Sequence, residues 1–157
     1  MEINWPTLIG NVVVGLLVAV VSARVTVYFA LKRFYSEKWW ERKAEAYGTI
    51  IEALHHMKNY ADQHMEFEMR GSELPEDRKK ELTENFKRGH GEVRKRADVG
   101  TFVICEEAVG ALVALEKDLE ASGNTTDWWE HLDLEYAAVS KCLKTMRDIA
   151  KEDLRIP

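Results

Sequence analysis

Proline, glycine and cysteine are all scarce in this chain of 157 residues. Three prolines and nine glycines leave room for long helices, and the many Ala, Leu, Glu and Lys residues are typical of helical proteins. The two cysteines, Cys105 and Cys142, are too few for a secreted disulfide scaffold and form no CxxC pair of the kind that binds metals. We therefore expect an all-α protein with two buried, reduced thiols.

An excess of basic residues is also absent, because the net charge is −5. Such a balance argues against a general nucleic-acid-binding protein. The sequence contains no Gly-rich phosphate loop, no Gly-x-Ser-x-Gly motif and no Cys-His pair with a family signature. These absences predict no nucleic-acid partner, no cofactor and no enzymatic activity.

One short motif, Glu52-Ala53-Leu54-His55, leaves a metal-binding helical-bundle enzyme as a distant alternative. Carboxylate-bridged di-iron bundles use Glu-x-x-His pairs, but they require a second such pair on another helix and two further inward carboxylates. His131 is followed by Glu135 four residues later, which is a different spacing. The sequence therefore predicts no metal site.

Charged side chains are almost missing from the first thirty residues, where Arg24 is the only full charge between Trp5 and Leu31. A helix needs about 20 mostly apolar residues to cross a bilayer core, and residues 8–31 exceed that length. The stretch is rich in Val, but lipid admits only helices and closed barrels. We therefore predict a transmembrane anchor over residues 1–31.

A cleaved signal peptide is the main alternative for this segment, because Val21-Ser22-Ala23 resembles a cleavage site. However, no Lys or Arg precedes the apolar run, whereas several follow it from Lys32 onward. Basic residues stay on the cytoplasmic side of a membrane. The N-terminus is therefore expected outside and the rest of the chain in the cytoplasm.

Small residues recur at four-residue spacing within the predicted anchor, and such spacing allows helices to approach closely in lipid. A helix-association face, and with it a homo-oligomer, is predicted through Gly15, Ala19, Ser22, Ala23 and Thr26. Lipid disfavours the polar Asn11 and Arg24. Either both lie near the interfaces, with Arg24 snorkelling, or both face a neighbouring subunit.

Residues 32–43 are predicted to form a basic, aromatic juxtamembrane junction, in which Trp39 and Trp40 lie among charges. Trp40 shares an apolar helical stripe with Tyr47 and Leu54, so it is expected to begin a soluble core, with Trp39 covering its membrane-facing edge. The alternative is that both tryptophans are interfacial anchors. The residues predicted at the membrane interface are Arg24, Tyr28, Lys32, Arg33, Lys38, Trp39, Arg42, Lys43, Arg94, Lys95 and Arg96.

Helical spacing continues through residues 44–157, which are predicted to form a cytosolic helical bundle. Short Gly-containing loops separate the helices, and short loops imply antiparallel neighbours in an up-down-up-down order. Residues 101–105 are either extended or open the third helix, and Thr126 or Asp127 is the expected N-cap of the last. The four helices are expected over about residues 6–70, 76–97, 106–121 and 127–154.

Two segments carry an excess of basic residues. Residues 32–43 contain five basic and two acidic side chains, and residues 87–96 contain five basic and one acidic. In an up-down-up-down bundle both segments would lie at the membrane-proximal end. They would bind anionic lipid headgroups there, each basic residue contributing about 1 kcal/mol. The alternative is that the second helix simply has a solvated, charged face.

The stretch RFYSEKWWERKAEAY and the following IIEALHHMKNY resemble an uncharacterised group of bacterial single-pass membrane-anchored helical proteins. The resemblance covers residues 32–60, with weaker likeness at 97–108 and 127–153, and implies a bacterial inner-membrane setting without an activity. We therefore expect a single-pass inner-membrane protein whose cytosolic bundle is an interaction or self-assembly module. An oligomeric membrane-permeabilising effector, using Asn11, Ser22, Arg24 and Thr26 as a polar face, is the alternative.

Overall fold

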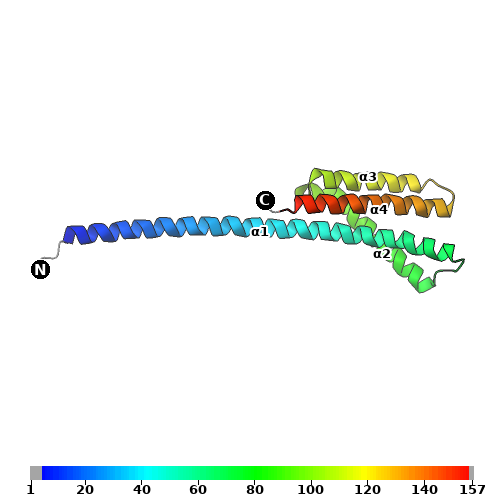
Figure 1. Ribbon diagram of the computed structural model, residues 1–157, viewed down its shortest axis with the longest axis horizontal. Coiled ribbons are helices and arrows are strands. Elements are labelled where there is room, and N and C mark those ends of the chain that lie inside the picture. The colour runs from blue at the N-terminus through cyan, green and yellow to red at the C-terminus, as the bar shows by residue number, and fades with distance from the viewer. Residues whose placement is uncertain (1–4, 156–157) are drawn as a thin grey trace. The chain divides into compact units, whose positions relative to one another are not determined.

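The computed structural model describes the backbone of residues 5–155 and the side chains of residues 16–155 other than Leu17 and Thr101. Within this part of the chain it contains helices and no strand (Figure 1), which confirms the predicted all-α class. The chain divides into two units, Met1–Glu41 and Arg42–Pro157, and we call the second unit the bundle. The elements are α1 (Trp5–Met69), α2 (Glu76–Val99), the 3₁₀ helix η1 (Gly100–Phe102), α3 (Glu106–Ser122) and α4 (Trp128–Asp153).

Local sequence determines where the helices of the bundle begin and end. α1 is closed by Gly71, whose positive φ of 62° permits the backbone N–H of Ser72 to donate to the carbonyl of Phe67 at 3.1 Å. Pro75 directly precedes α2. Asp127 caps α4, because its carboxylate accepts from the backbone N–H of Glu130 at 3.3 Å. The second of the two predicted caps is therefore the one that forms.

Successive helices of the bundle are antiparallel neighbours. At one end, which we call the basal end, the hydroxyl of Tyr47 in α1 reaches both Cys105 before α3 and Asp153 at the end of α4. At the other end, the distal end, the ring of His64 lies 5.8 Å from that of Trp128. The connection between α2 and α3 and the C-terminal end of α4 therefore both lie near the point where the chain enters the bundle at Arg42.

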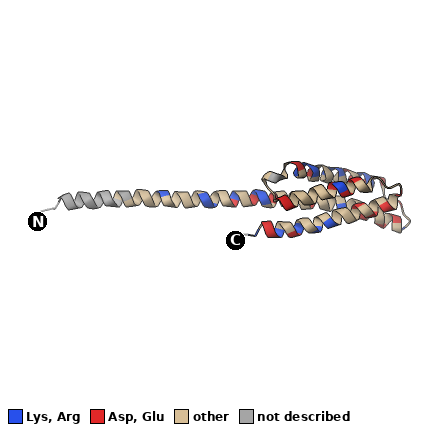
Figure 2. Ribbon diagram, turned by 90° about the horizontal axis from the view of Figure 1, so that it is seen from above, with Lys and Arg blue, Asp and Glu red and all other residues tan. Residues whose placement is uncertain are grey.

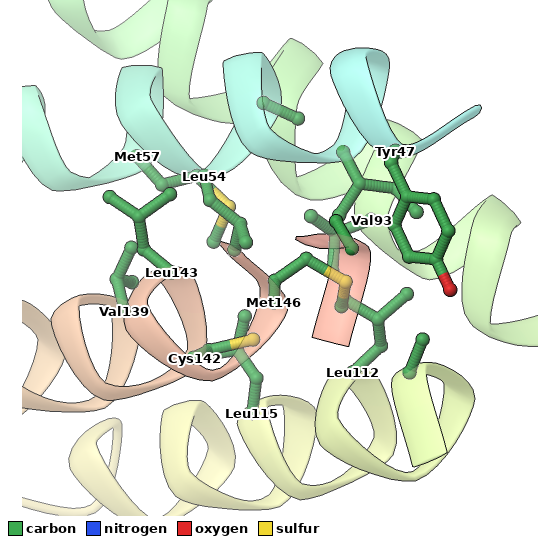
Figure 3. Close-up of a cluster of buried hydrophobic side chains, with 14 of the residues drawn as sticks. Tyr47, Leu54, Met57, Val93, Leu112, Leu115, Val139, Cys142, Leu143 and Met146 are labelled. Carbon is green, nitrogen blue, oxygen red and sulfur yellow. The ribbon is translucent and has the colours of Figure 1, made fainter. Parts of the chain in front are cut away.

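A continuous apolar core joins α1, α2, α3 and α4 within the bundle (Figure 3). Met146 of α4 lies in the middle of this core, between the α1 and α3 side chains. Burying an aliphatic or aromatic side chain of this size stabilises a fold by about 1.5–3 kcal/mol. The largest fully buried side chains include Tyr47, Ile50, Leu54, Met57, Leu82, Val93, Leu112, Leu115, Leu132, Val139 and Met146.

The tryptophan that helical spacing assigned to the start of the core is exposed instead. Trp40 is 42% exposed, while the first buried residues of α1 are Ala46 and Tyr47. The prediction that Trp40 begins the soluble core was wrong. In the bundle, α4 ends at Asp153 beside Tyr47, and helical spacing alone does not say how far along a helix its neighbours extend.

Gly89 allows α2 to approach α1 closely. A Cβ at this position would lie 2.7 Å from the carbonyl oxygen of Ala53 and 3.2 Å from Cγ of Met57. Gly91, two residues later, has nothing within 4 Å. The sequence indicates only that both glycines weaken the second helix, whereas the structure distinguishes a packing glycine from one that faces open space.

Candidate functional site

Apolar side chains surround the first described part of α1. Ten of them, each between 49% and 64% exposed, lie between Leu16 and Phe34. Consecutive residues of a helix point about 100° apart, so neighbours such as Val20 and Val21 face different sides. A helix that is apolar all round is typical of a protein core or a membrane. The ten residues are Leu16, Val18, Val20, Val21, Val25, Val27, Tyr28, Phe29, Leu31 and Phe34.

Among the residues that the structure describes, no helical segment has both the length and the apolar character needed to cross a membrane.

The predicted anchor and association face extend beyond the described side chains. Residues 5–15 lie outside them, and these include Asn11 and Gly15. Ala19, Ser22, Ala23 and Thr26 are described and exposed. The hydroxyl of Thr26 donates to the backbone carbonyl of Ser22 at 2.8 Å, so this polar group is satisfied within its own helix, as a Thr in apolar surroundings requires.

The basic side chains of the junction have acidic neighbours one turn away. Arg33 pairs with Glu37 at 2.7 Å, and Lys38 pairs with Glu41 at 2.5 Å. All four side chains are more than half exposed, and exposed pairs of this kind contribute about 0.2–0.5 kcal/mol to a helix. The other predicted interface residues before Arg42, namely Arg24, Tyr28, Lys32 and Trp39, are exposed as well.

Within the bundle, the five predicted interface residues have different surroundings. Lys43 is about one-fifth exposed and pairs with Asp153 at 2.8 Å, so its charge joins α1 to α4 within the bundle. Arg96 pairs with Glu92 at 2.8 Å, and Lys95 lies 3.9 Å from the same carboxylate. Arg42 and Arg94 are exposed. No local sequence pattern indicated that Lys43 pairs with a residue 110 positions away.

The excess of basic residues at the basal end is smaller than the composition of residues 87–96 indicates. Gly89 packs against Ala53, so the neighbouring Lys87 and Arg88 lie midway between the two ends of the bundle. Of the basic residues in this segment, residues 94–96 lie near the basal end. The fold also brings acidic residues to that end from the start of α3 and the end of α4. Figure 2 shows basic and acidic residues interspersed along the helices. The acidic residues at the basal end include Glu106 and Glu107 of α3 and Glu152 and Asp153 of α4.

A polar cluster closes the basal end of the core. The hydroxyl of Tyr47 donates to Asp153 at 2.6 Å, and the backbone N–H of Cys105 donates to the same hydroxyl at 3.4 Å. Partial burial opposes ionisation of Asp153, but hydrogen bonds from Lys43 and Tyr47 outweigh it and lower the pKa of this carboxyl. Burial and the bond to Asp153 raise the pKa of Tyr47, so its hydroxyl remains a donor.

We expect Tyr47→Phe to lower the free energy of unfolding of the bundle by about 1.5–3 kcal/mol, because it removes a hydrogen bond to a charged group but leaves the ring packing intact. Tyr60→Phe is the matched control, since Tyr60 lies on the same helix and its ring packs against Phe86 at 4.9 Å. Urea denaturation followed by far-UV circular dichroism measures both. Equal losses for the two variants would contradict a specific role for the Tyr47 hydroxyl.

A second polar cluster lies inside the distal half of the bundle. Glu135 of α4 is only 3% exposed, and Nε2 of His131 lies 3.5 Å from one of its oxygens. The other oxygen of Glu135 is buried without a hydrogen-bond partner. Burial raises the pKa of Glu135 to about 7, although His131 and His90 act in the opposite direction. The carboxyl therefore exchanges its proton near neutral pH.

The groups around Glu135 come from every helix of the bundle. Nδ1 of His131 lies 3.0 Å from the backbone carbonyl of Ser122, which fixes its ring. Nε2 of His90 lies 3.1 Å from the carboxylate of Glu116 in α3. On α1, Nε2 of His64 is buried without a partner, and burial lowers the pKa of this histidine. In the sequence, the spacing of His131 and Glu135 bears only on metal binding. It did not predict this buried cluster of polar side chains.

Neither the cysteines nor the histidines form a metal centre among the described residues, where no group of three His, Cys, Asp or Glu side chains could hold an ion. Glu52 and His55 of the Glu-x-x-His motif are both exposed. Cys105 and Cys142 are free thiols, and burial raises the pKa of Cys142 to about 11, which keeps it protonated and unreactive at neutral pH.

No protein-family profile matches this chain, and comparisons with curated proteins and with solved structures find no significant match.

Proposed function

We propose that this chain is a single-pass protein of a bacterial inner membrane, with its N-terminus outside and its helical bundle in the cytoplasm. In this proposal the bundle is an interaction or self-assembly module rather than an enzyme. The observation that carries the proposal is the set of exposed apolar side chains on all sides of α1 from Leu16 to Phe34. The preceding residues 3–15 contain no charged side chain. Lipid supplies the apolar surroundings that such a helix requires.

The distribution of charge supports the orientation. No Lys or Arg precedes Arg24, and Lys32, Arg33, Lys38 and Arg42 follow the apolar stretch. Positive residues are retained on the cytoplasmic side. Because Arg33 and Lys38 are more than half exposed, their ion pairs with Glu37 and Glu41 leave them accessible to headgroups. Acidic residues contribute little to orientation, so these pairs do not cancel the effect.

Features of the described helix favour an anchor over a permeabilising effector. The Thr26 hydroxyl donates to the carbonyl of Ser22, and a bonded hydroxyl has less to offer an aqueous pore. Ala19 and Ala23 have small side chains and lie on the same face of the helix. Small residues at this spacing allow two such helices to pack closely in lipid. Self-association of the anchor is therefore part of the proposal.

The topology can be tested with reporters fused after Pro157 of the full chain. We expect a fluorescent protein to be bright and alkaline phosphatase to be inactive, since phosphatase folds only outside the cytoplasm. Replacing Lys32, Arg33 and Lys38 with Asn should raise phosphatase activity by weakening the orientation signal. Replacing Arg78, Lys79 and Lys80, which lie in α2, is the control and should leave it low. Active phosphatase on the unaltered chain would overturn the proposed orientation.

A further inference from the structure

The most exposed large apolar side chain in the described part of the protein lies at the basal end of the bundle. Phe102 is 77% exposed and Val99 is 57% exposed. Val99 is the last residue of α2, and Phe102 ends η1 (Gly100–Phe102) in the connection to α3. Phe102 and Val99 are three residues apart in the chain, and exposed apolar patches with a polar rim mark interaction sites.

The connection is a built turn that holds Phe102 outward. The backbone N–H groups of Val103 and Ile104 both donate to the carbonyl of Gly100, at 2.8 and 2.9 Å. Ile104 is 5% exposed and belongs to the core. A Cβ on Gly100 would lie 3.0 Å from its side chain. Ile104 therefore fixes the turn from beneath, which leaves Phe102 on the outside.

Basic residues flank this apolar tip. Arg94 and Lys95 are exposed in the last turns of α2, directly before the connection. Arg42, where the chain enters the bundle, is exposed as well. Acidic residues follow in the first turn of α3, at Glu106 and Glu107. Charge attraction alone is therefore modest, and an apolar contact must supply much of any affinity for an anionic surface.

We propose that Phe102 and Val99 insert into the interfacial layer of an anionic bilayer, with Arg94 and Lys95 at the level of the headgroups. This inference rests on the proposed membrane anchor. Arg42 follows Leu31 by only 11 residues, so the chain between the proposed anchor and the bundle is short and tethers the bundle to the membrane. An apolar tip flanked by Arg and Lys is the pattern of interfacial membrane binding.

Photocrosslinking of the full chain in liposomes tests the insertion. The photoreactive residue p-benzoylphenylalanine is placed in turn at position 21, 69 or 102, and lipid adducts are measured by mass spectrometry. Position 21 reports on the anchor, and Met69, which is 71% exposed at the distal end of the bundle, is the matched control. In vesicles with anionic lipid, adducts at position 102 should exceed those at 69 by about tenfold or more, because burying a side chain of this size shifts an equilibrium by at least that factor.

The outcomes separate this inference from the proposed function. Lipid adducts at position 21 but not at 102 would overturn the insertion and leave the anchor standing. Absence of adducts at position 21 would overturn the anchor itself. Adducts at position 102 to a second copy of the chain, in place of lipid, would show that the tip is a protein interface. A second arm places the photoreactive residue at position 99, where Phe102→Asp should reduce lipid adducts several-fold and Met69→Asp should not.

Discussion

Gly89→Val is expected to destabilise the bundle by about 3 kcal/mol, since overpacking a close helix contact costs about 1–3 kcal/mol and occasionally more. The nearest obstacle is the carbonyl oxygen of Ala53, at 2.7 Å from a Cβ placed on Gly89. This oxygen belongs to the backbone of α1 and cannot rotate away as a side chain would. Relief requires the two helices to separate, which opens the core around Met57, itself 3.2 Å from that Cβ.

Gly91→Val provides the matched control for this prediction. The position lies two residues along the same helix, and a Cβ placed there has nothing within 4 Å. Val is a better helix former than Gly, so the control should be neutral or stabilise the bundle by a few tenths of a kcal/mol, by about the propensity difference. Denaturant unfolding of both variants gives the two free energies. A similar loss at both positions would mean that Gly89 has no special packing role.

Glu135→Gln is expected to stabilise the bundle by up to about 3 kcal/mol above pH 7 and to have little effect near pH 4.5, because each pKa unit corresponds to about 1.4 kcal/mol. In the folded chain the pKa of Glu135 is raised from 4.5 to about 7. Between those values the folded state holds a proton that the unfolded chain has released. The stability contributed by this group is therefore fully present below about pH 4.5 and is lost as pH rises to about 7.

The environment of Glu135 explains this direction. Tyr60 and His64 of α1, His90 of α2 and Glu116 of α3 join His131 in the same region. Among the described side chains, only His131 pairs with the carboxyl, at 3.5 Å, and one carboxyl oxygen has no hydrogen-bond partner. Burial of the charged form thus outweighs the attraction of the histidines. An amide carries no charge and escapes that penalty.

Measuring the free energy of unfolding of both chains from pH 4.5 to pH 8.5 tests the prediction. The difference between Glu135→Gln and the unaltered protein should grow with pH and level off above about 7. Glu84→Gln, at an exposed position of α2, controls for the loss of a carboxylate in general. A difference that stays constant across the range would show that Glu135 is ionised in the folded chain as readily as in the unfolded one.

Parts of the candidate sites were open to prediction from sequence. The exposed apolar side chains on all sides of α1 could be predicted from its nearly uncharged sequence, because a helix on the surface of a soluble protein has only one apolar face. Glu135 was missed although a signal existed. It lies three residues after Leu132 and four before Val139, on the apolar face of α4, where a charged residue stands out. Phe102 carried no signal, because the apolar spacing that predicts burial does not extend into a connection between helices.

The sequence by itself determined the all-α class, the helix boundaries to within a few residues, and the core positions Tyr47 and Leu54. These depend on local features, namely 3.6-residue spacing, a Gly at positive φ and an Asp cap, which act within a few residues of one another. Only the tertiary structure decided that Trp40 is exposed, that Lys43 pairs with Asp153, and that Gly89 packs while Gly91 does not. Each of these depends on where a neighbouring helix ends or how closely it approaches, and that distance is set by contacts between residues far apart in the chain.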